Sequence, residues 1–197
     1  MATPLAFFDV DTQFDFMDPR GSLYVKGAQE IRGRLQQLIA YAREHGIPIL
    51  SSADAHPPDD PSFDEWPPHC VVGTAGQPRI PETQVPNASV VPNRPGAFAP
   101  PREWPAQIII EKVEYDASTN ANFAAILQAL GERRFVVFGV ATEYCVRSTV
   151  LSLLRIGCEV ELVIDAVKAI DETSGREAVE EMVEAGAELV TTTAVCK

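Results

Sequence analysis

Short, continuously apolar segments recur along the chain, and stretches with helical periodicity separate them. Six segments have the length and composition of strands: LAFFDV (5–10), IPILSS (47–52), QIIIEK (107–112), RFVVFGVA (134–141), EVELVIDA (159–166) and ELVTTT (188–193). They lack the sustained apolar–polar alternation of a strand with one wet face, so burial on both faces is expected. Buried strands that alternate with amphipathic helices are typical of a parallel sheet with helices on both sides. The pattern therefore predicts an α/β protein with an open parallel sheet of about five or six strands, in a single domain over residues 1–197.

The segments between the strands support this arrangement. Residues 28–46 (AQEIRGRLQQLIAYAREHG) end at Gly46 and place one set of apolar residues on a single helical face: Ile31, Leu35, Leu38, Ile39 and Ala42. Residues 122–132 and 175–188 have the same character. Residues 54–102, in contrast, hold most of the 16 prolines. A proline-rich stretch of this length inside a compact domain is more often a functional loop than a linker.

Charge and cysteine content restrict the partners and the setting. The net charge is −12 and no cluster of Lys and Arg is present, so binding to nucleic acid or to an anionic membrane is not expected. A small neutral or polar partner is expected instead. Because Asp9 and Asp11 interrupt the first apolar run, we do not expect this run to be a secretory leader or a membrane span. The four cysteines follow no disulfide pattern, so a cytoplasmic setting is expected. The first strand is followed by DVDTQFDF and by no glycine-rich turn, which argues against a dinucleotide-binding dehydrogenase.

Polar residues of several chemical types follow the expected strands. Asp11 follows the first strand, Asp54 and His56 follow the second, and Lys112 and Cys145 come at or after two later ones. In open parallel sheets, ligands bind beyond the carboxyl ends of the strands. Any one of these residues is common at a strand end, but an acid, a lysine, a cysteine and an Asp-x-His pair together predict a site at this edge.

Cys145 is a candidate nucleophile. It lies at the start of an expected helix, where backbone amides and the helix dipole favour a thiolate, and a nearby Lys112 would favour it further. Asp11 can accept a proton, so the three side chains suit covalent attack on an amide carbonyl. Backbone amides between Ala141 and Cys145 are candidates for an oxyanion hole.

The proline-rich loop contains two of the three histidines and a candidate metal site. Asp54 and His56 project to the same side of an extended segment, and His69 completes a set suited to Zn²⁺, Fe²⁺ or Mn²⁺. The alternative is a pair of surface histidines in a polar loop. Two nearby acids are candidates for further ligands: Asp64 and Glu65. The third histidine, His45, is interpreted as a cation at the end of a helix.

Four parts of the sequence resemble the isochorismatase-like cysteine hydrolases, and within them the nicotinamidase branch. They are DVDTQFDFMDPRGSLYVKGAQEI, DAHPPDDPSFDEWPPHCVVGTAGQ, the lysine that ends QIIIEK, and GVATEYCVRSTVLSLLRIGCEVELVIDAVKAI. They occur in order over nearly the whole chain, and the Trp-Pro-Pro-His-Cys-Val-x-Gly-Thr block is specific to the nicotinamidase branch. The resemblance implies the family's three-layer, Rossmann-like fold and the conversion of nicotinamide to nicotinate and ammonia through a thioester.

The same resemblance implies a role for each candidate residue. The implied catalytic triad is Asp11, Lys112 and Cys145. The implied ligands of a divalent metal, with Zn²⁺ preferred over Fe²⁺ or Mn²⁺, are Asp54, His56 and His69. The implied walls around a pyridine ring are Phe16 and Trp66, which otherwise read as ordinary packing residues. A cis peptide bond is implied at Val140–Ala141, where it would shape the oxyanion hole.

The substrate stays open at this stage. The loop between the two histidine ligands is shorter than is usual in the branch, and STNANF replaces the usual aromatic block after the lysine, with Asn120 or Asn122 in its place. One alternative is a related hydrolase that acts on another small amide, carbamoyl or ureido compound. Another is a non-catalytic protein of the same fold that binds a metal or a ligand. Family members are often dimers or larger, so homo-oligomers are compatible with the sequence.

Overall fold

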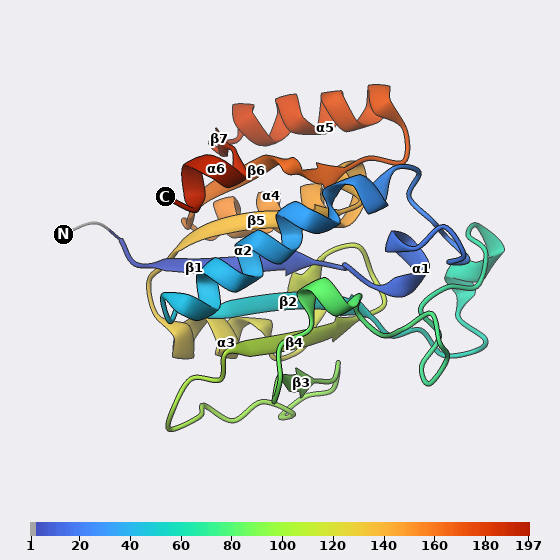
Figure 1. Ribbon diagram of the computed structural model, residues 1–197. Helices are drawn as coiled ribbons and strands as arrows, with labels where there is room; N and C mark the ends of the chain where they lie inside the picture. Colours follow the sequence, from blue (N-terminus) through green and yellow to red (C-terminus); the bar gives the residue numbers. More distant parts are fainter. Residues whose placement is uncertain (1–2) are drawn as a thin grey trace.

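The computed structural model describes residues 3–197, and seven parallel strands form one sheet at its centre (Figure 1). The strand order is β3-β4-β2-β1-β5-β6-β7. The strands are β1(Leu5–Val10), β2(Ile49–Asp54), β3(Ser89–Val91), β4(Gln107–Lys112), β5(Arg134–Val140), β6(Glu159–Lys168) and β7(Glu188–Val190). The parallel α/β sheet expected from the sequence is confirmed.

The sheet has one strand more than the five or six expected. The additional strand is β3, which lies in the proline-rich region and pairs with β4 at the sheet edge, with Val90 opposite Ile109. It has only three residues. Because residues 54–102 were interpreted as one proline-rich loop, no strand was expected there.

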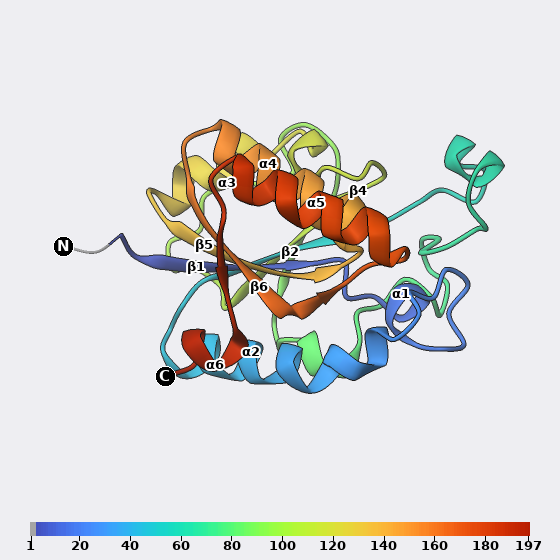
Figure 2. The ribbon, with the colours of Figure 1, turned by 90° about the horizontal axis from the view of Figure 1, so that it is seen from above.

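Helices cover both faces of the sheet. They are α1(Phe14–Met17), α2(Arg32–Glu44), α3(Phe123–Leu130), α4(Arg147–Arg155), α5(Glu172–Glu184) and α6(Thr192–Val195). In Figure 2, α3, α4 and α5 lie on one side of the sheet, and α2 and α6 lie on the other. The expected three-layer arrangement is therefore present.

Two neighbouring residues of β1 illustrate how the two cores form. Successive side chains of a strand point to opposite faces. Phe8 packs in the core under α3, where its ring is 6.4 Å from that of Phe123. Phe7 packs in the core under α2, against Tyr41 and Phe138. Because both faces are apolar, β1 is a central strand, and residues that follow it are held by a rigid scaffold.

The carboxyl ends of the strands lie at one edge of the sheet, where α1 and the loop after β2 gather (right side of Figure 1). Gly139, near the end of β5, has a φ of 124°, and a Cβ atom there would lie 2.1 Å from the carbonyl oxygen of Val10 in β1. Only glycine permits this close approach of the two strand ends. Among the described residues, no helix has the length and apolar character needed to cross a membrane.

Candidate active site

Four adjacent strands supply the side chains expected at the sheet edge. Lys112 and Asp54 are the last residues of β4 and β2 and are paired in register, and Asp11 directly follows β1. Cys145 follows β5. The order β4-β2-β1-β5 therefore places all four residues side by side, although they are far apart in sequence.

Lys112 is the centre of this group. Its Nζ lies 2.9 Å from Oδ2 of Asp11 and 2.5 Å from Oδ1 of Asp54, and it donates a hydrogen bond of 3.5 Å to Sγ of Cys145. The side chains of Lys112 and Asp11 are fully buried. The structure thus brings together the acid, the lysine and the cysteine that the sequence singled out.

Burial and mutual attraction set the charges of the group. Burial alone would lower the pKa of Lys112, but the carboxylates of Asp11 and Asp54 raise that pKa well above its ordinary value. Burial raises the pKa of Asp11, the nearby Asp54 raises it further, and the lysine charge opposes both effects. For Asp54, Lys112 and the hydrogen bonds of two histidines outweigh burial and hold the pKa well below the usual range. The group is therefore a lysine cation with two carboxylates, of which Asp11 has the higher affinity for a proton.

Burial acts against ionisation of the Cys145 thiol. Burial raises its pKa well above the ordinary value, and Lys112 offsets only part of that effect. Lys112 acts in the direction that the sequence predicts, since its charge lowers this pKa, but burial raises the pKa by more. The thiol needs a base before it can attack, and the raised proton affinity of the neighbouring Asp11 is suited to that role.

The turn that carries Cys145 differs from the ordinary helix start that we expected. Residues Thr142–Val146 form a π-helical turn, and α4 begins only at Arg147. The bond between Val140 and Ala141 is cis, as the family resemblance implied. Ala141 and Cys145 both line a cavity, so the backbone of this turn lies at the cavity wall.

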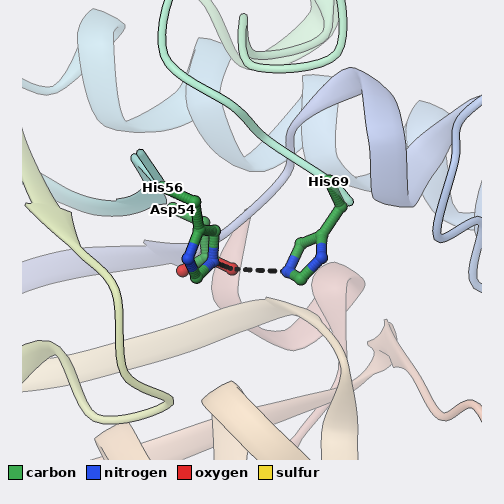
Figure 3. Close-up of side chains that lie close together, drawn as sticks. All are labelled: Asp54, His56 and His69. Carbon is green, nitrogen blue, oxygen red and sulfur yellow. Dashed lines mark ion pairs between the residues drawn. The ribbon is translucent and has the colours of Figure 1, made fainter. Parts of the chain in front are cut away.

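Asp54, His56 and His69 form a second group beside the lysine (Figure 3). One ligand atom from each lies within 4.8 Å of the others, and all three residues are buried. Nε2 of each histidine is 3.7 Å from Oδ2 of Asp54. In residues 3–197 this is the only group of three or more His, Cys, Asp and Glu side chains with the geometry of a metal site.

The other ring nitrogen of each histidine has a partner of its own. Nδ1 of His56 lies 3.0 Å from Oδ2 of Asp60, and Nδ1 of His69 lies 2.9 Å from the carbonyl oxygen of Pro67. Such partners fix the orientation of a metal-binding imidazole and leave Nε2 free for the metal. Hydrogen bonds to Asp54 and Asp60 outweigh burial and raise the pKa of His56, so the site favours positive charge. The donor set fits a divalent cation of the Zn²⁺, Fe²⁺ or Mn²⁺ type.

The two further acids considered as ligands lie outside this group. Asp64 and Glu65 are exposed, and neither belongs to the cluster. They are in the 3₁₀ turn that follows Asp60 and immediately after it. Asp60, which we did not single out from the sequence, is the acid that contacts a histidine, four residues after His56.

Two buried residues after β1 hold in place the segment from Asp54 to Cys70, which carries the candidate metal ligands and which we call the metal-site loop. The side-chain amide of Gln13 donates to the carbonyl oxygen of Asp54 at 2.8 Å and accepts from its N–H at 2.7 Å. Asp15 accepts a hydrogen bond of 2.7 Å from the N–H of Cys70, next to His69. These bonds fix the backbone at Asp54 and next to His69. Neither Gln13 nor Asp15 could be identified from the sequence, because no spacing between residues indicates these contacts.

A cavity of about 460 Å³ opens above Cys145 and the metal-site residues. Phe16 and Trp66, the expected ring-binding residues, both line it. The ring of Phe16 lies 5.4 Å from that of His69. Tyr115 and Tyr144 add two further aromatic walls that sequence reasoning did not identify.

The asparagines considered for the ring pocket have a structural role instead. Asn120 donates to the carbonyl oxygens of Val91 and Glu111, and Asn122 donates to the carbonyl oxygens that follow β3. Both are buried, and neither lines the cavity. Tyr115, three residues after Lys112, is the aromatic residue on this side, so the expectation for Asn120 and Asn122 is wrong.

Comparison with known proteins is consistent with this geometry. A family model described as the Isochorismatase domain matches residues 6–194. The nicotinamidase/pyrazinamidase of Mycobacterium tuberculosis is 29% identical over 192 residues, which cover 94% of this chain and 97% of that protein. The nicotinamidase of Acinetobacter baylyi is 30% identical over 187 residues, which cover 86% of this chain and 84% of that protein.

A solved structure is similar over the same length. The crystal structure of the pyrazinamidase of Pyrococcus horikoshii in complex with zinc has a TM-score of 0.81 and 34% sequence identity, and the match covers 94% of this chain and 98% of that chain. The family match extends over nearly all of the sheet and over every residue of the site. The chain therefore belongs to the isochorismatase family and is an amide hydrolase.

Proposed function

We propose that this hydrolase converts nicotinamide to nicotinate and ammonia through a thioester on Cys145. The observation that carries the proposal is the Cys145 thiol, which faces an aromatic-lined cavity, 3.5 Å from the Lys112 ammonium and beside the group of Asp54 and two histidines. A flat ring with one primary amide suits these walls, and the two nicotinamidases that are similar over most of the chain support this choice.

In the first half of the reaction, Asp11 takes the proton of the Cys145 thiol, and the sulfur attacks the carbonyl carbon of the amide. Lys112 lies close to both groups and stabilises the thiolate as it forms. Backbone amides of the turn from Ala141 to Cys145 donate to the oxygen of the tetrahedral intermediate. Asp11 then returns its proton to the amide nitrogen, the carbon–nitrogen bond breaks, and ammonia leaves a thioester behind.

In the second half, a water molecule attacks the thioester carbon while Asp11 accepts its proton. The carbon–sulfur bond breaks, the sulfur recovers the proton, and the carboxylic acid is released. Both halves require a group that alternates between base and acid. Because the pKa of Asp11 is raised, its proton affinity is closer to that of the groups with which it exchanges protons than the proton affinity of an exposed carboxylate would be.

We assign Asp54, His56 and His69 as ligands of a divalent metal, with Zn²⁺ as the first candidate and Fe²⁺ or Mn²⁺ as alternatives. Such an ion, when bound, supplies a Lewis acid that anchors a ring nitrogen and orients the substrate. Phe16 and Trp66 contribute the apolar surface against which the ring lies. The free thiols of all four cysteines accord with a reducing cytoplasm, in which we place the enzyme.

Ammonia release from nicotinamide tests the proposal. The metal-loaded protein is assayed with nicotinamide beside a panel of small primary amides, carbamoyl compounds and ureido compounds. We expect the highest kcat/KM for nicotinamide. Absence of nicotinamide turnover, with turnover of a carbamoyl or ureido compound, would reject the substrate and retain the chemistry.

Cys145→Ala tests the nucleophile. We expect loss of hydrolysis, with metal content and thermal stability close to those of the parent protein. The matched control is Cys158→Ala, which removes a thiol outside the cavity. If Cys145→Ala retained activity, the assignment of the nucleophile would be wrong.

A further inference from the structure

Three aromatic side chains of the cavity wall contact one another. Nε1 of Trp66 donates a hydrogen bond of 2.9 Å to the hydroxyl oxygen of Tyr115. The ring of Tyr144 lies 5.4 Å from that of Trp66 in an edge-to-face arrangement, and 5.2 Å from that of Tyr115. All three side chains line the cavity. We call them the aromatic trio.

The trio joins three of the segments that carry the site residues. Trp66 precedes His69 by three residues on the metal-site loop, Tyr115 follows Lys112 by three residues, and Tyr144 is next to Cys145. The backbone hydrogen bonds around Trp66 are local: its N–H donates to the carbonyl oxygen of Ser62 at 2.9 Å, and Pro67 and Pro68 have no N–H to donate. The hydrogen bond to Tyr115 is therefore the polar contact that attaches the Trp66 side chain to the strand end.

We propose that Tyr115 is a positioning residue, which holds the indole of Trp66 in the orientation that receives the substrate ring. This inference rests on the proposed function for the identity of the ring, but the hydrogen bond itself is independent of it. An indole that lacks the bond keeps its apolar area and loses a fixed orientation. Substrate then binds less tightly, whereas Cys145, Asp11 and Lys112 keep their mutual distances. The expected signature is a higher KM with an unchanged kcat.

Tyr115→Phe is the informative variant, because it removes one oxygen atom and keeps the ring. The chain has two tryptophans, Trp66 and Trp104. Trp104→Phe gives a parent in which Trp66 is the only indole, and Nε1 of Trp104 has no hydrogen-bond partner in the described chain, so no bond is lost. Tyr41→Phe, on α2 and outside the cavity, is the matched control for loss of a hydroxyl.

Fluorescence of the ligand-free, metal-loaded protein measures the position of Trp66 without any substrate. In the Trp104→Phe parent, Tyr115→Phe is expected to shift the emission of Trp66, to increase its quenching by acrylamide and to add a fast component to its anisotropy decay. Tyr41→Phe is expected to change none of these. Unchanged Trp66 fluorescence in Tyr115→Phe would overturn the proposal, whatever the enzyme hydrolyses.

Kinetics provide the second arm. With nicotinamide, Tyr115→Phe is expected to raise KM about two- to tenfold, the range of one hydrogen bond, at constant kcat. A fluorescence change without a KM increase, or an equal loss in kcat, would also overturn the positioning role. If the Trp104→Phe parent and the unaltered protein both fail to turn over nicotinamide, the proposed function fails, and the fluorescence arm still decides whether Tyr115 fixes the indole.

Discussion

Replacement of Lys112 by Met is expected to destabilise the protein severely, because it leaves two buried carboxylates without their cation. Lys112 is fully buried between Asp11 and Asp54, at 2.9 and 2.5 Å. Removal of one partner from a buried ion pair costs about 3–5 kcal/mol of unfolding free energy. In a domain of this length each kcal/mol lowers Tm by about 2–4 °C, so Tm should fall by about 6–20 °C.

The measurement is thermal and urea unfolding of chelator-treated protein at pH 7.5, so that a bound metal does not neutralise Asp54. Arg147→Met is the matched control. It removes a cation of similar size from a pair with Glu181 of short N–O distance, but both side chains are substantially exposed. A pair of that kind contributes at most about 1 kcal/mol, so Tm should fall by less than about 4 °C.

The loss of stability in Lys112→Met is expected to depend on pH. In the parent protein the pKa of Asp54 is held low, so its contribution to stability persists at every pH above the ordinary value for aspartate. Without Lys112, burial raises the pKa of both orphaned carboxyls, and protonation relieves their repulsion as the pH falls. The loss of stability should therefore be smaller at pH 5 than at pH 7.5. An equal loss at both pH values, or a loss no larger than that of Arg147→Met, would refute the charge assignment.

Three further predictions concern the metal, the base and the scaffold. His56→Ala is expected to lower the bound divalent metal, measured by elemental analysis, from about one equivalent to a small fraction, whereas His45→Ala at the end of α2 should retain it. Because burial raises the pKa of Asp11, kcat/KM should fall as the pH is lowered, with an apparent pKa above the ordinary aspartate value of about 3.9. An apparent pKa at or below that value in the pH profile would contradict Asp11 as the base. Gly139→Ala places a Cβ atom 2.1 Å from a backbone oxygen at a φ of 124°, so unfolding free energy should fall by more than about 2 kcal/mol, whereas Gly33→Ala, with open space around it, should be neutral or stabilising.

The location of the candidate site could be predicted from the sequence because of one property of parallel sheets. All strands end at the same edge, so a polar residue at the end of each apolar run falls near the others once the strand order is suitable. Asp11, Asp54 and Lys112 follow this rule, since β1, β2 and β4 are neighbours. The rule does not give strand order, so it predicts that Cys145 lies at the same edge but not that it meets Asp11 and Lys112.

Features that depend on tertiary packing could not be predicted in the same way. The pKa of Cys145 is raised chiefly by burial, which no local pattern around the residue reveals. Tyr115 was missed because its contact with Trp66 joins two loops that are far apart in sequence. Asn120 and Asn122 were considered for the pocket because they stand where the resembling family has an aromatic block, whereas their amides donate to backbone carbonyls of β3, β4 and the loop after β3.

The charges of the site connect the thiol chemistry with the metal site. One lysine faces two carboxylates, so the group of Asp11, Asp54 and Lys112 carries an excess of negative charge. Burial and the two carboxylates raise the pKa of Cys145 against the opposing effect of Lys112, and hydrogen bonds to Asp54 and Asp60, which outweigh burial, raise the pKa of His56. A divalent cation held by Asp54 would reverse the sign of the local charge and thereby favour both the thiolate and an oxyanion. Asp54 contacts Lys112 on one side and the histidines on the other, so a cation bound there would act on both groups through this one carboxylate.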